Sequence, residues 1–568
     1  MPRNFYRGRA ADGRLEFEVP YRGAELIDQP MYNKSTAFTR EERRTFALEG
    51  LLPDQVSTME LQARRVTANI VRKKEAIERY IGLAALQDRN EHLFYRVLLD
   101  NLEKFLPIVY TPTVGQASRE FSHIFRRARG TWITPEHRGR IRQVLENNPF
   151  SDVRLIVVTD NEAILGIGDQ GAGGMVIPVG KLAIYSAAAG IHPASTLPIS
   201  LDVGTNNEEL LGDELYLGWR QPRLRGDEYF DMVEEFVQAV SELFPRALVQ
   251  WEDFRNENAH ELLARYRRRL LSFNDDIQGT GATALAGILA AERITERTLS
   301  EERVMIVGAG AAGGGIAAQL RAAMATEGLA DDDLIRAVAV LDSRGLLVEG
   351  RGHLGGGKAA LAWPREMAAS AGLEVGAELA ELVAGYRPTV LIGTSGRPGM
   401  FTREVVEAMA AHVARPLIFP FSNPNSLSEA EPADLVQWTD GDALIASGSP
   451  FDPVIHGGRE HRIGQGNNAF IFPAIGLGAL VAEVAEVTDA MFTAAASALA
   501  GCVSDDELAT FSLYPSISRL RDVTRTVAIA VVAQANSDGR GKVIEPDDMA
   551  GAVDDFMWEP EYPVLVPT

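Results

Sequence analysis

The chain has 568 residues, too many for one hydrophobic core, and its content of 46% hydrophobic and 24% charged residues is ordinary for a folded globular protein, so we expect two or more domains. Its net charge of −22 argues against nucleic acid as a partner, and its single cysteine, Cys502, excludes an internal disulfide and a cysteine-based metal site. No apolar run is long enough to span a bilayer, and no apolar stretch follows the basic residues of the N-terminus, so we expect a cytoplasmic protein with no membrane partner.

The negative charge can serve solubility alone, but it also constrains any small substrate. A small dianion would be repelled by the surface of this protein. An enzyme that acts on such a substrate therefore needs local positive charge, from a metal ion, a lysine or helix N-termini.

The pattern of apolar residues changes along the chain. Residues 1–125 read as mostly helical, because Glu41–Leu48 and Val56–Tyr80 combine apolar spacings of three and four with many charges. From about Arg154 onward, short apolar runs alternate with helical patterns, which predicts parallel sheets with helices on both faces. Ligands of such sheets bind beyond the carboxyl ends of the strands. The predicted strands are Leu155–Val158, Leu197–Leu201, Ala247–Trp251, Val304–Val307, Val338–Leu341, Val390–Ile392, Leu417–Phe419 and Leu444–Ala446.

A glycine-rich turn follows the predicted strand Arg303–Val307 and precedes a predicted helix from Gly314 to Ala323. This is the context in which G-x-G-x-x-G binds the pyrophosphate of a dinucleotide at a helix N-terminus, although a glycine-rich helix start can also pack closely and bind nothing. Asp342, at the end of the next strand, can bind a ribose hydroxyl and favours NAD, whereas Arg344 can meet a 2′-phosphate and leaves NADP open. The three glycines of the pattern are Gly308, Gly310 and Gly313.

Two acidic pairs follow apolar runs. Glu252-Asp253 comes after Ala247–Trp251, and Asp275-Asp276 comes after Leu270–Asn274. Each pair alone also fits solvated loop acids or a helix N-cap. Adjacent carboxylates at the ends of buried strands repel one another unless a cation compensates, and several carboxylate oxygens suit Mn²⁺ or Mg²⁺. The two pairs together therefore predict a divalent metal site.

Lys181 and Tyr110 are candidates for proton transfer. Lys181 lies among apolar residues at the start of a predicted helix, where burial and a nearby metal would lower its pKa toward that of a general base. Tyr110 lies in Leu106–Gly115 between Pro107 and Pro112, which predicts a rigid extended segment. A structural lysine and a packed core tyrosine are the alternatives.

Three amides stand in loops that follow or separate apolar runs, namely Asn423 in Ser422–Pro424 and Asn467 and Asn468 in Gln465–Ala469. Such amides can orient a carboxylate or a nicotinamide. They can equally cap turns.

Taken together, these segments resemble the malic enzyme family in its long form, in order and in spacing. The resemblance extends from about Asn33 to beyond Asn468. The segments that carry it are Leu106–Gly115, Thr159–Gly171, Ile177–Leu182, Leu201–Asn207, Trp251–Phe254, Phe273–Thr280, Gly308–Gly313 and Ser422–Pro424.

The resemblance implies a role for each matching residue. Lys181 matches the general base, Tyr110 the general acid, and Asp275 the acid that supports base and metal. The implied reaction is oxidative decarboxylation of L-malate to pyruvate and CO₂ with reduction of NAD or NADP. The remaining matches are Glu252, Asp253 and Asp276 to the metal ligands, Gly308, Gly310 and Gly313 to the dinucleotide loop, and Asn423 and Asn468 to the substrate amides. Beside these matches, we expect Asp342 and Asn423 at the dinucleotide site and Asn467 at the substrate site.

One position departs from the family pattern. Malic enzymes usually carry an arginine where this chain has Ala163, and a methyl group does not replace its forked donors. Related malolactic enzymes carry a small residue there and convert L-malate to L-lactate with bound NAD. Gln170, where malolactic enzymes have tryptophan, favours the malic enzyme reaction. A catalytically inactive metabolite-binding protein is a third reading, but it predicts loss of Lys181, Tyr110 or a metal carboxylate, and none is lost.

The expected fold is α/β, with a Rossmann-type dinucleotide-binding domain, a second parallel-sheet α/β domain and a helical N-terminal domain. We expect the active site in the cleft between the two α/β domains, and the resemblance implies a homodimer or homotetramer. The expected boundaries are 1–125 for the helical domain, 126–278 for the substrate and metal domain with 468–535 returning to it, 279–467 for the Rossmann domain, and 536–568 for a C-terminal extension.

Overall fold

The computed structural model describes residues 6–164, 166–352, 354–355, 357–371, 373 and 376–568. Leu165, part of the segment Thr159–Gly171, lies outside the described residues. The chain divides into two compact units. The first comprises residues 1–162, 169–248 and 555–568, and the second comprises residues 163–168 and 249–554.

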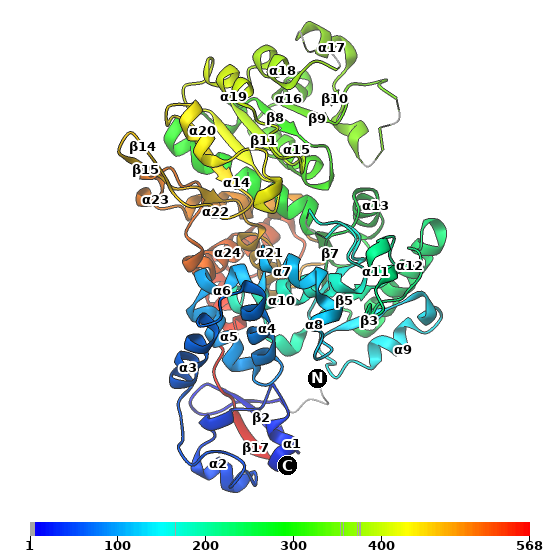
Figure 1. Cartoon of the computed structure of the whole chain (residues 1–568), viewed down its shortest axis with the longest axis vertical. Helices are drawn as coiled ribbons and strands as arrows, with labels where there is room; N and C mark the ends of the chain where they lie inside the picture. Colours follow the sequence, from blue (N-terminus) through cyan, green and yellow to red (C-terminus); the bar gives the residue numbers. More distant parts are fainter. Residues whose placement is uncertain (1–5, 165, 353, 356, 372, 374–375) are drawn as a thin grey trace. The chain divides into compact units, whose positions relative to one another are not determined.

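The first unit begins with a small sheet that the sequence pattern did not predict. Strand β2 (Leu15–Val19) pairs antiparallel with β1 (Tyr6–Arg9) and parallel with β17 (Val564–Pro567), so both ends of the chain meet in one sheet. The helical character expected of residues 1–125 is otherwise present (Figure 1). The helices are α1 (Gly23–Ile27), α2 (Arg40–Thr45), α3 (Met59–Val71), α4 (Ala76–Gln87), α5 (Glu91–Asp100), α6 (Leu102–Val109), α7 (Thr113–Arg119) and α8 (Phe121–Ile124).

Three parallel strands lie side by side in the α/β part of the first unit. Strand β5 (Thr196–Leu201) lies between β3 (Thr131–Ile133) and β4 (Leu155–Thr159). Every residue of β4 and β5 is buried, as expected of strands covered on both faces. The helices of this part are α9 (Ile141–Glu146), α10 (Val176–Ala188), α11 (Glu208–Gly212) and α12 (Gly226–Leu243).

The second unit contains a Rossmann-type sheet, which agrees with the predicted fold class. Its strand order is β10-β9-β8-β11-β12-β13-β16, and the strands run parallel except β10, which pairs antiparallel with β9. The strand order reverses between β8 and β11, the position where ligands of such sheets bind. The strands are β8 (Val304–Val307), β9 (Val338–Asp342), β10 (Gly345–Leu346), β11 (Val390–Gly393), β12 (Leu417–Pro420), β13 (Leu444–Ser447) and β16 (Gly464–Gln465).

Helices connect these strands, and an antiparallel hairpin precedes the last one. Figure 1 shows α15, α16, α18, α19 and α20 in the same green to yellow part of the chain as β8, β9 and β11. The helices are α14 (Thr280–Thr295), α15 (Ala311–Thr326), α16 (Asp331–Ala337), α17 (Arg365–Ser370), α18 (Leu379–Tyr386), α19 (Arg403–Ala410) and α20 (Pro432–Trp438), and the hairpin strands are β14 (Val454–His456) and β15 (Arg459–His461).

The helices after Asn467 also belong to the second unit. Helix α22 (Asp489–Gly501) packs against α14 and α24 (Leu520–Asp538), and α21 (Phe472–Val481), buried on every side, packs against α24. These helices also meet residues of the predicted 126–278 domain, because Arg267 forms an ion pair with Asp489 at 3.0 Å. Helices α23 (Asp505–Ala509) and α25 (Met549–Phe556) complete the C-terminal region. Within the described residues, none of the helices has the length and apolarity required to cross a bilayer.

Candidate functional site

The pairing of two short strands brings the two acidic pairs together. Strand β6 (Leu248–Trp251) runs parallel to β7 (Ser272–Asn274), with Trp251 opposite Asn274. The residues that follow each strand therefore leave the same edge of the sheet side by side. Those residues are Glu252 and Asp253 after β6 and Asp275 and Asp276 after β7.

Three of these carboxylates form a compact group. One oxygen from each of Glu252, Asp253 and Asp276 lies within 4.8 Å of the other two. Glu252 is 2% exposed and Asp253 is 6% exposed, so two of the charges are buried. Like charges buried this close together are unfavourable unless a cation lies among them, and hard carboxylate oxygens suit Mn²⁺ or Mg²⁺. The donor set therefore fits a divalent metal.

Backbone and side-chain hydrogen bonds hold the carboxylates in place. The N–H of Asp253 donates to Oδ2 of Asp276 at 2.8 Å, and Nε2 of Gln250 donates to Oε2 of Glu252 at 2.8 Å. Asp253 has φ of +55°, a left-handed conformation uncommon outside glycine that is often kept at functional sites. Residues Asp275–Gly279 form a π-helical turn, which the sequence pattern did not predict.

The fourth acid, Asp275, has a different environment. It is fully buried, and Oδ2 accepts a hydrogen bond from Nδ2 of Asn468 at 3.2 Å. The same Nδ2 donates to Oγ1 of Thr280 at 3.0 Å, while Oδ1 of Asn468 accepts from Thr283 at 3.1 Å. Asn468 thus orients Asp275, a contact that the prediction of a substrate amide did not include.

Lys181 and Tyr110 lie close together in the first unit. Lys181, on α10, is 2% exposed, and its Nζ lies 5.5 Å from the centroid of the Tyr110 ring. Tyr110 ends α6, and a side chain at Gly180 would approach the carbonyl oxygen of Val109 to 2.6 Å, so this glycine allows α6 and α10 to pack closely. The structure therefore brings the two predicted candidates for proton transfer close to each other.

The local structure around Tyr110 differs from the prediction. Pro107 lies inside α6 and Pro112 precedes α7, so Leu106–Gly115 forms the end of one helix and the start of another. The predicted rigid extended segment is wrong. Phe105, Leu106 and Ile108 are all buried, and their packing keeps the helix despite the missing N–H of the proline.

The glycine-rich turn has the geometry of a dinucleotide cradle. Gly308 has φ of +124°, and a Cβ on Gly313 would lie 1.8 Å from the carbonyl oxygen of Gly308, so neither position accepts a side chain. A Cβ on Gly310 would meet nothing within 4 Å, which leaves open space in front of the N-terminus of α15. The backbone amides of a helix N-terminus and the helix dipole suit a pyrophosphate at that position. The residues present therefore fit a dinucleotide.

Asp342 ends β9 and is surrounded by donors. Its Oδ2 lies 2.6 Å from Nη2 of Arg351 and 3.6 Å from Nζ of Lys358, and its Oδ1 accepts from the N–H of Arg344 at 2.8 Å. Burial acts to raise the pKa of Asp342, but the hydrogen bonds from Arg344 and Arg351 outweigh it and lower the pKa. The carboxylate stays ionised and can accept from a ribose hydroxyl.

Of the two other predicted amides, one caps a turn and one lies beyond a strand of the Rossmann sheet. Oδ1 of Asn467 accepts from the N–H of Ala469 at 2.9 Å. Asn467 therefore caps a turn, the role that the sequence offered as the alternative to binding a ligand. Asn423 follows β12, and its Oδ1 accepts from Oγ of Ser449 at 2.5 Å.

Known proteins match almost the whole chain. Residues 87–267 match the family described as "Malic enzyme, N-terminal domain", and residues 277–536 match "Malic enzyme, NAD binding domain". The chain belongs to the malic enzyme family. It is 46% identical to an "NAD-dependent malic enzyme" of Sodalis glossinidius over 555 residues, 96% of this chain and 98% of that protein. A protein of the same name from Aeromonas hydrophila is 47% identical over 545 residues, 96% of either chain.

Solved structures share the fold. The Entamoeba histolytica malic enzyme has a TM-score of 0.57 at 23% identity and covers 90% of each chain. The Pyrococcus horikoshii malic enzyme has a TM-score of 0.54 at 22% identity, over 80% of this chain and 89% of that one. These likenesses support the α/β fold class with a Rossmann-type domain.

Two groups of residues that support this malic enzyme fold were missed in the sequence. Glu429, fully buried, accepts hydrogen bonds from Ser395 and Ser422, which follow β11 and β12. Arg223, also buried, binds Asp169 and the carbonyl of Asp160. An arginine in a glycine- and proline-containing loop reads as a surface residue, so only the tertiary structure identifies its partners.

Proposed function

We infer that the chain is an NAD-dependent malic enzyme, which oxidises L-malate and decarboxylates it to pyruvate and CO₂. The observation that carries this inference is the near full-length identity of 46% to an enzyme of that name. The compact carboxylate group, the buried lysine–tyrosine pair and the glycine cradle support it, because each is a part that the reaction requires.

Two bound groups would supply chemistry that side chains lack. We propose that Glu252, Asp253 and Asp276 hold Mn²⁺ or Mg²⁺, which when bound lowers the pKa of the malate hydroxyl and stabilises negative charge on oxygen. NAD, held by the glycine cradle and by Asp342, supplies the hydride acceptor.

The side chains of the first unit would move the protons. We propose that Lys181 removes the proton of the C2 hydroxyl as the hydride leaves C2. Tyr110 then gives its phenolic proton to C3 after CO₂ has left. We further propose that the lysine returns a proton to the phenol, and the nearness of Nζ of Lys181 to the Tyr110 ring, 5.5 Å from its centroid, is compatible with this step.

The amides and the fourth acid would orient these groups. We propose that Asp275, held by Asn468, supports the base and the metal, and that Asn423, Asn467 and Asn468 contact the substrate, with Asn423 also near the nicotinamide. We further propose a homodimer or homotetramer, which light scattering after size-exclusion chromatography tests.

The deciding experiment supplies L-malate and Mn²⁺ with NAD or NADP, follows reduced cofactor at 340 nm and identifies the product. Pyruvate formed in equal amount with NADH is expected. Lactate without accumulating NADH would instead assign the malolactic reaction, for which Ala163 is the one favouring residue. If the protein binds NAD but turns over no malate, the result would support the third interpretation, a catalytically inactive metabolite-binding protein. Asp276→Asn should weaken Mn²⁺ binding and abolish turnover, whereas Asp547→Asn on the exposed surface should change neither.

A further inference from the structure

A short loop, residues 163–168, belongs to the second unit, whereas the residues on either side of it belong to the first unit. We call these flanking residues, 160–162 and 169–170, the stem of the loop. The chain leaves the first unit after Glu162 and re-enters it at Asp169, and residues 163–168 belong to the second unit. The backbone closes the stem, because the N–H of Gln170 donates to the carbonyl of Asn161 at 3.0 Å.

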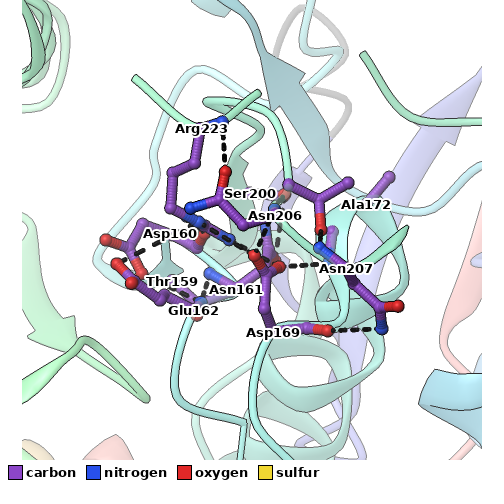
Figure 2. A network of polar contacts seen from close by, with 12 residues as sticks. Thr159, Asp160, Asn161, Glu162, Asp169, Ala172, Ser200, Asn206, Asn207 and Arg223 are labelled. Atoms are coloured by element: carbon purple, nitrogen blue, oxygen red, sulfur yellow. Dashed lines mark hydrogen bonds and ion pairs between the residues drawn. The ribbon is translucent and has the colours of Figure 1, made fainter. Parts of the chain in front are cut away.

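Arg223 holds both sides of this stem. Its Nη1 donates to the carbonyl of Asp160 at 2.7 Å, and its Nη2 and Nε donate to the carboxylate of Asp169 at 2.7 and 3.1 Å (Figure 2). Nε also lies 4.0 Å from Oε2 of Glu162. The Arg223 side chain is 0% exposed, so water does not compete for the hydrogen bonds that its guanidinium group donates.

The partners of Arg223 are themselves fixed. Asp169 also accepts from the N–H groups of Gly171 and Asn206 at 3.0 and 2.9 Å, and its carbonyl accepts from Nδ2 of Asn207 at 3.1 Å (Figure 2). Burial acts to raise the pKa of Asp169, but the hydrogen bond and charge of Arg223 outweigh it and lower the pKa. We call Arg223 and its partners Asp160 and Asp169 the clamp. Arg223 and Asp169 are ionised and both oxygens of the Asp169 carboxylate accept hydrogen bonds, so the network has little freedom to shift.

The loop touches two residues of the proposed active site. The N–H of Ala163 donates to the carbonyl of Asp253 at 3.0 Å. A Cβ on Gly166 would lie 2.4 Å from the carbonyl of Asn423, so the backbone packs directly on the loop after β12. Because Asp253 has φ of +55°, its conformation depends on contacts such as this hydrogen bond.

We propose that Arg223 is a positioning residue. Through the loop 163–168 it fixes the positions of the metal ligand Asp253 and of the amide Asn423. The proposal rests on the proposed function, since it takes Asp253 as a ligand of the divalent metal. Arg223 would touch neither substrate nor metal. Its effect would pass from the stem to Ala163 and Gly166, and from them to the two backbone carbonyls.

The test compares two buried arginines of the first unit in the full chain. Arg223→Lys keeps the charge but loses the planar fork. Arg43→Lys is the matched control, because Arg43 is 5% exposed and donates to backbone carbonyls such as that of Phe38, in a different part of the sequence. Electron paramagnetic resonance measures Mn²⁺ affinity, and hydrogen exchange measures protection of the peptide 159–170.

Arg223→Lys should weaken Mn²⁺ binding about 10- to 100-fold, as loss of residues that orient metal ligands typically does, and should speed exchange at 163–168. Arg43→Lys should leave both within about twofold. Equal affinities in Arg223→Lys and wild type, or equal losses in the two variants, would overturn the proposal. If Arg223→Lys fails to fold, Asp169→Asn decides by the same readouts. If the wild type does not bind Mn²⁺, the proposed function is refuted instead. Hydrogen exchange at residues 163–168 would then still test whether Arg223 holds the loop.

Discussion

Replacing His92 and His192 together should make the first unit less sensitive to acid. His92 is 1% exposed, its ring lies 5.4 Å from that of Trp558, and neither ring nitrogen finds a hydrogen-bond partner among the described residues. Nε2 of His192 is equally buried without a partner in that part of the chain, while Nδ1 accepts from the N–H of Ala194. Burial, with smaller effects of His192 and Lys34, lowers the pKa of His92 to about 3, and burial lowers the pKa of His192 to about 4.

These values give the sign and the size of the effect. In the unfolded chain a histidine has a pKa of about 6.5, so below that pH the unfolded state binds protons that the folded state refuses. Stability is therefore complete above about pH 6.5 and falls as the pH falls toward the folded pKa values. At pH 5 the loss is about 1.5 pH units times about 1.4 kcal/mol, roughly 2 kcal/mol for each histidine and roughly 4 kcal/mol for both.

The assay compares melting temperatures at pH 8 and pH 5 for the wild type and for His92→Leu/His192→Asn. Leucine suits the apolar site of His92, and the asparagine oxygen can still accept from Ala194. At roughly 2–4 °C per kcal/mol, the double variant should lose about 8–16 °C less than the wild type between the two pH values. His412→Asn, at an exposed position, should behave as the wild type does. The same acid-induced drop in wild type and double variant would refute the burial argument.

Three further predictions concern the reaction. Lys181→Met should lower kcat by about 10²- to 10⁴-fold with NAD affinity unchanged by fluorescence titration, and a normal kcat would remove Lys181 as the base. Gly313→Ala should raise the KM for NAD at least about tenfold, because the new Cβ would lie 1.8 Å from the carbonyl of Gly308, while Gly501→Ala, which meets nothing within 4 Å, should not. Asp342→Ala should raise the ratio of kcat/KM for NADP to that for NAD by about tenfold, since Arg351 and Lys358 lose their carboxylate partner; an unchanged ratio would contradict a ribose role for Asp342.

Apolar runs predicted the α/β part of the fold well. The run Val304–Val307 is strand β8, and Leu155–Val158 and Val390–Ile392 each differ by one residue from β4 and β11. Strands buried on both faces leave continuous apolar stretches, which is why composition alone finds them. The small sheet of β1, β2 and β17 was missed because β1 is largely exposed, β2 alternates apolar and acidic residues, and β17 is a very short apolar run beside prolines.

The candidate site could be proposed from the sequence as a set of residue types, but its supporting geometry could not. The acidic pairs after β6 and β7 were found because parallel strands place their carboxyl ends together. The left-handed backbone of Asp253, the π-helical turn at Asp275–Gly279 and the bond from Asn468 to Asp275 depend on tertiary contacts that leave no local pattern. Arg223 was missed for the same reason, since its partners are up to 63 residues away in sequence.

The acidic character of the chain makes position 163 informative about how malate is held. With a net charge of −22, the surface does not attract a dianion, so the local cations must. The proposed metal is one such cation, whereas Lys181, as the proposed general base, has to be neutral to take the proton of the malate hydroxyl. Ala163 adds none, because its side chain is a methyl group and its N–H already donates to Asp253. The forked contact that an arginine makes with a carboxylate must therefore be replaced by amides or by the metal, and a hydrogen bond from a neutral amide is weaker than one from a guanidinium. Binding of malate should for that reason depend more heavily on the divalent ion here than in a relative that keeps the arginine.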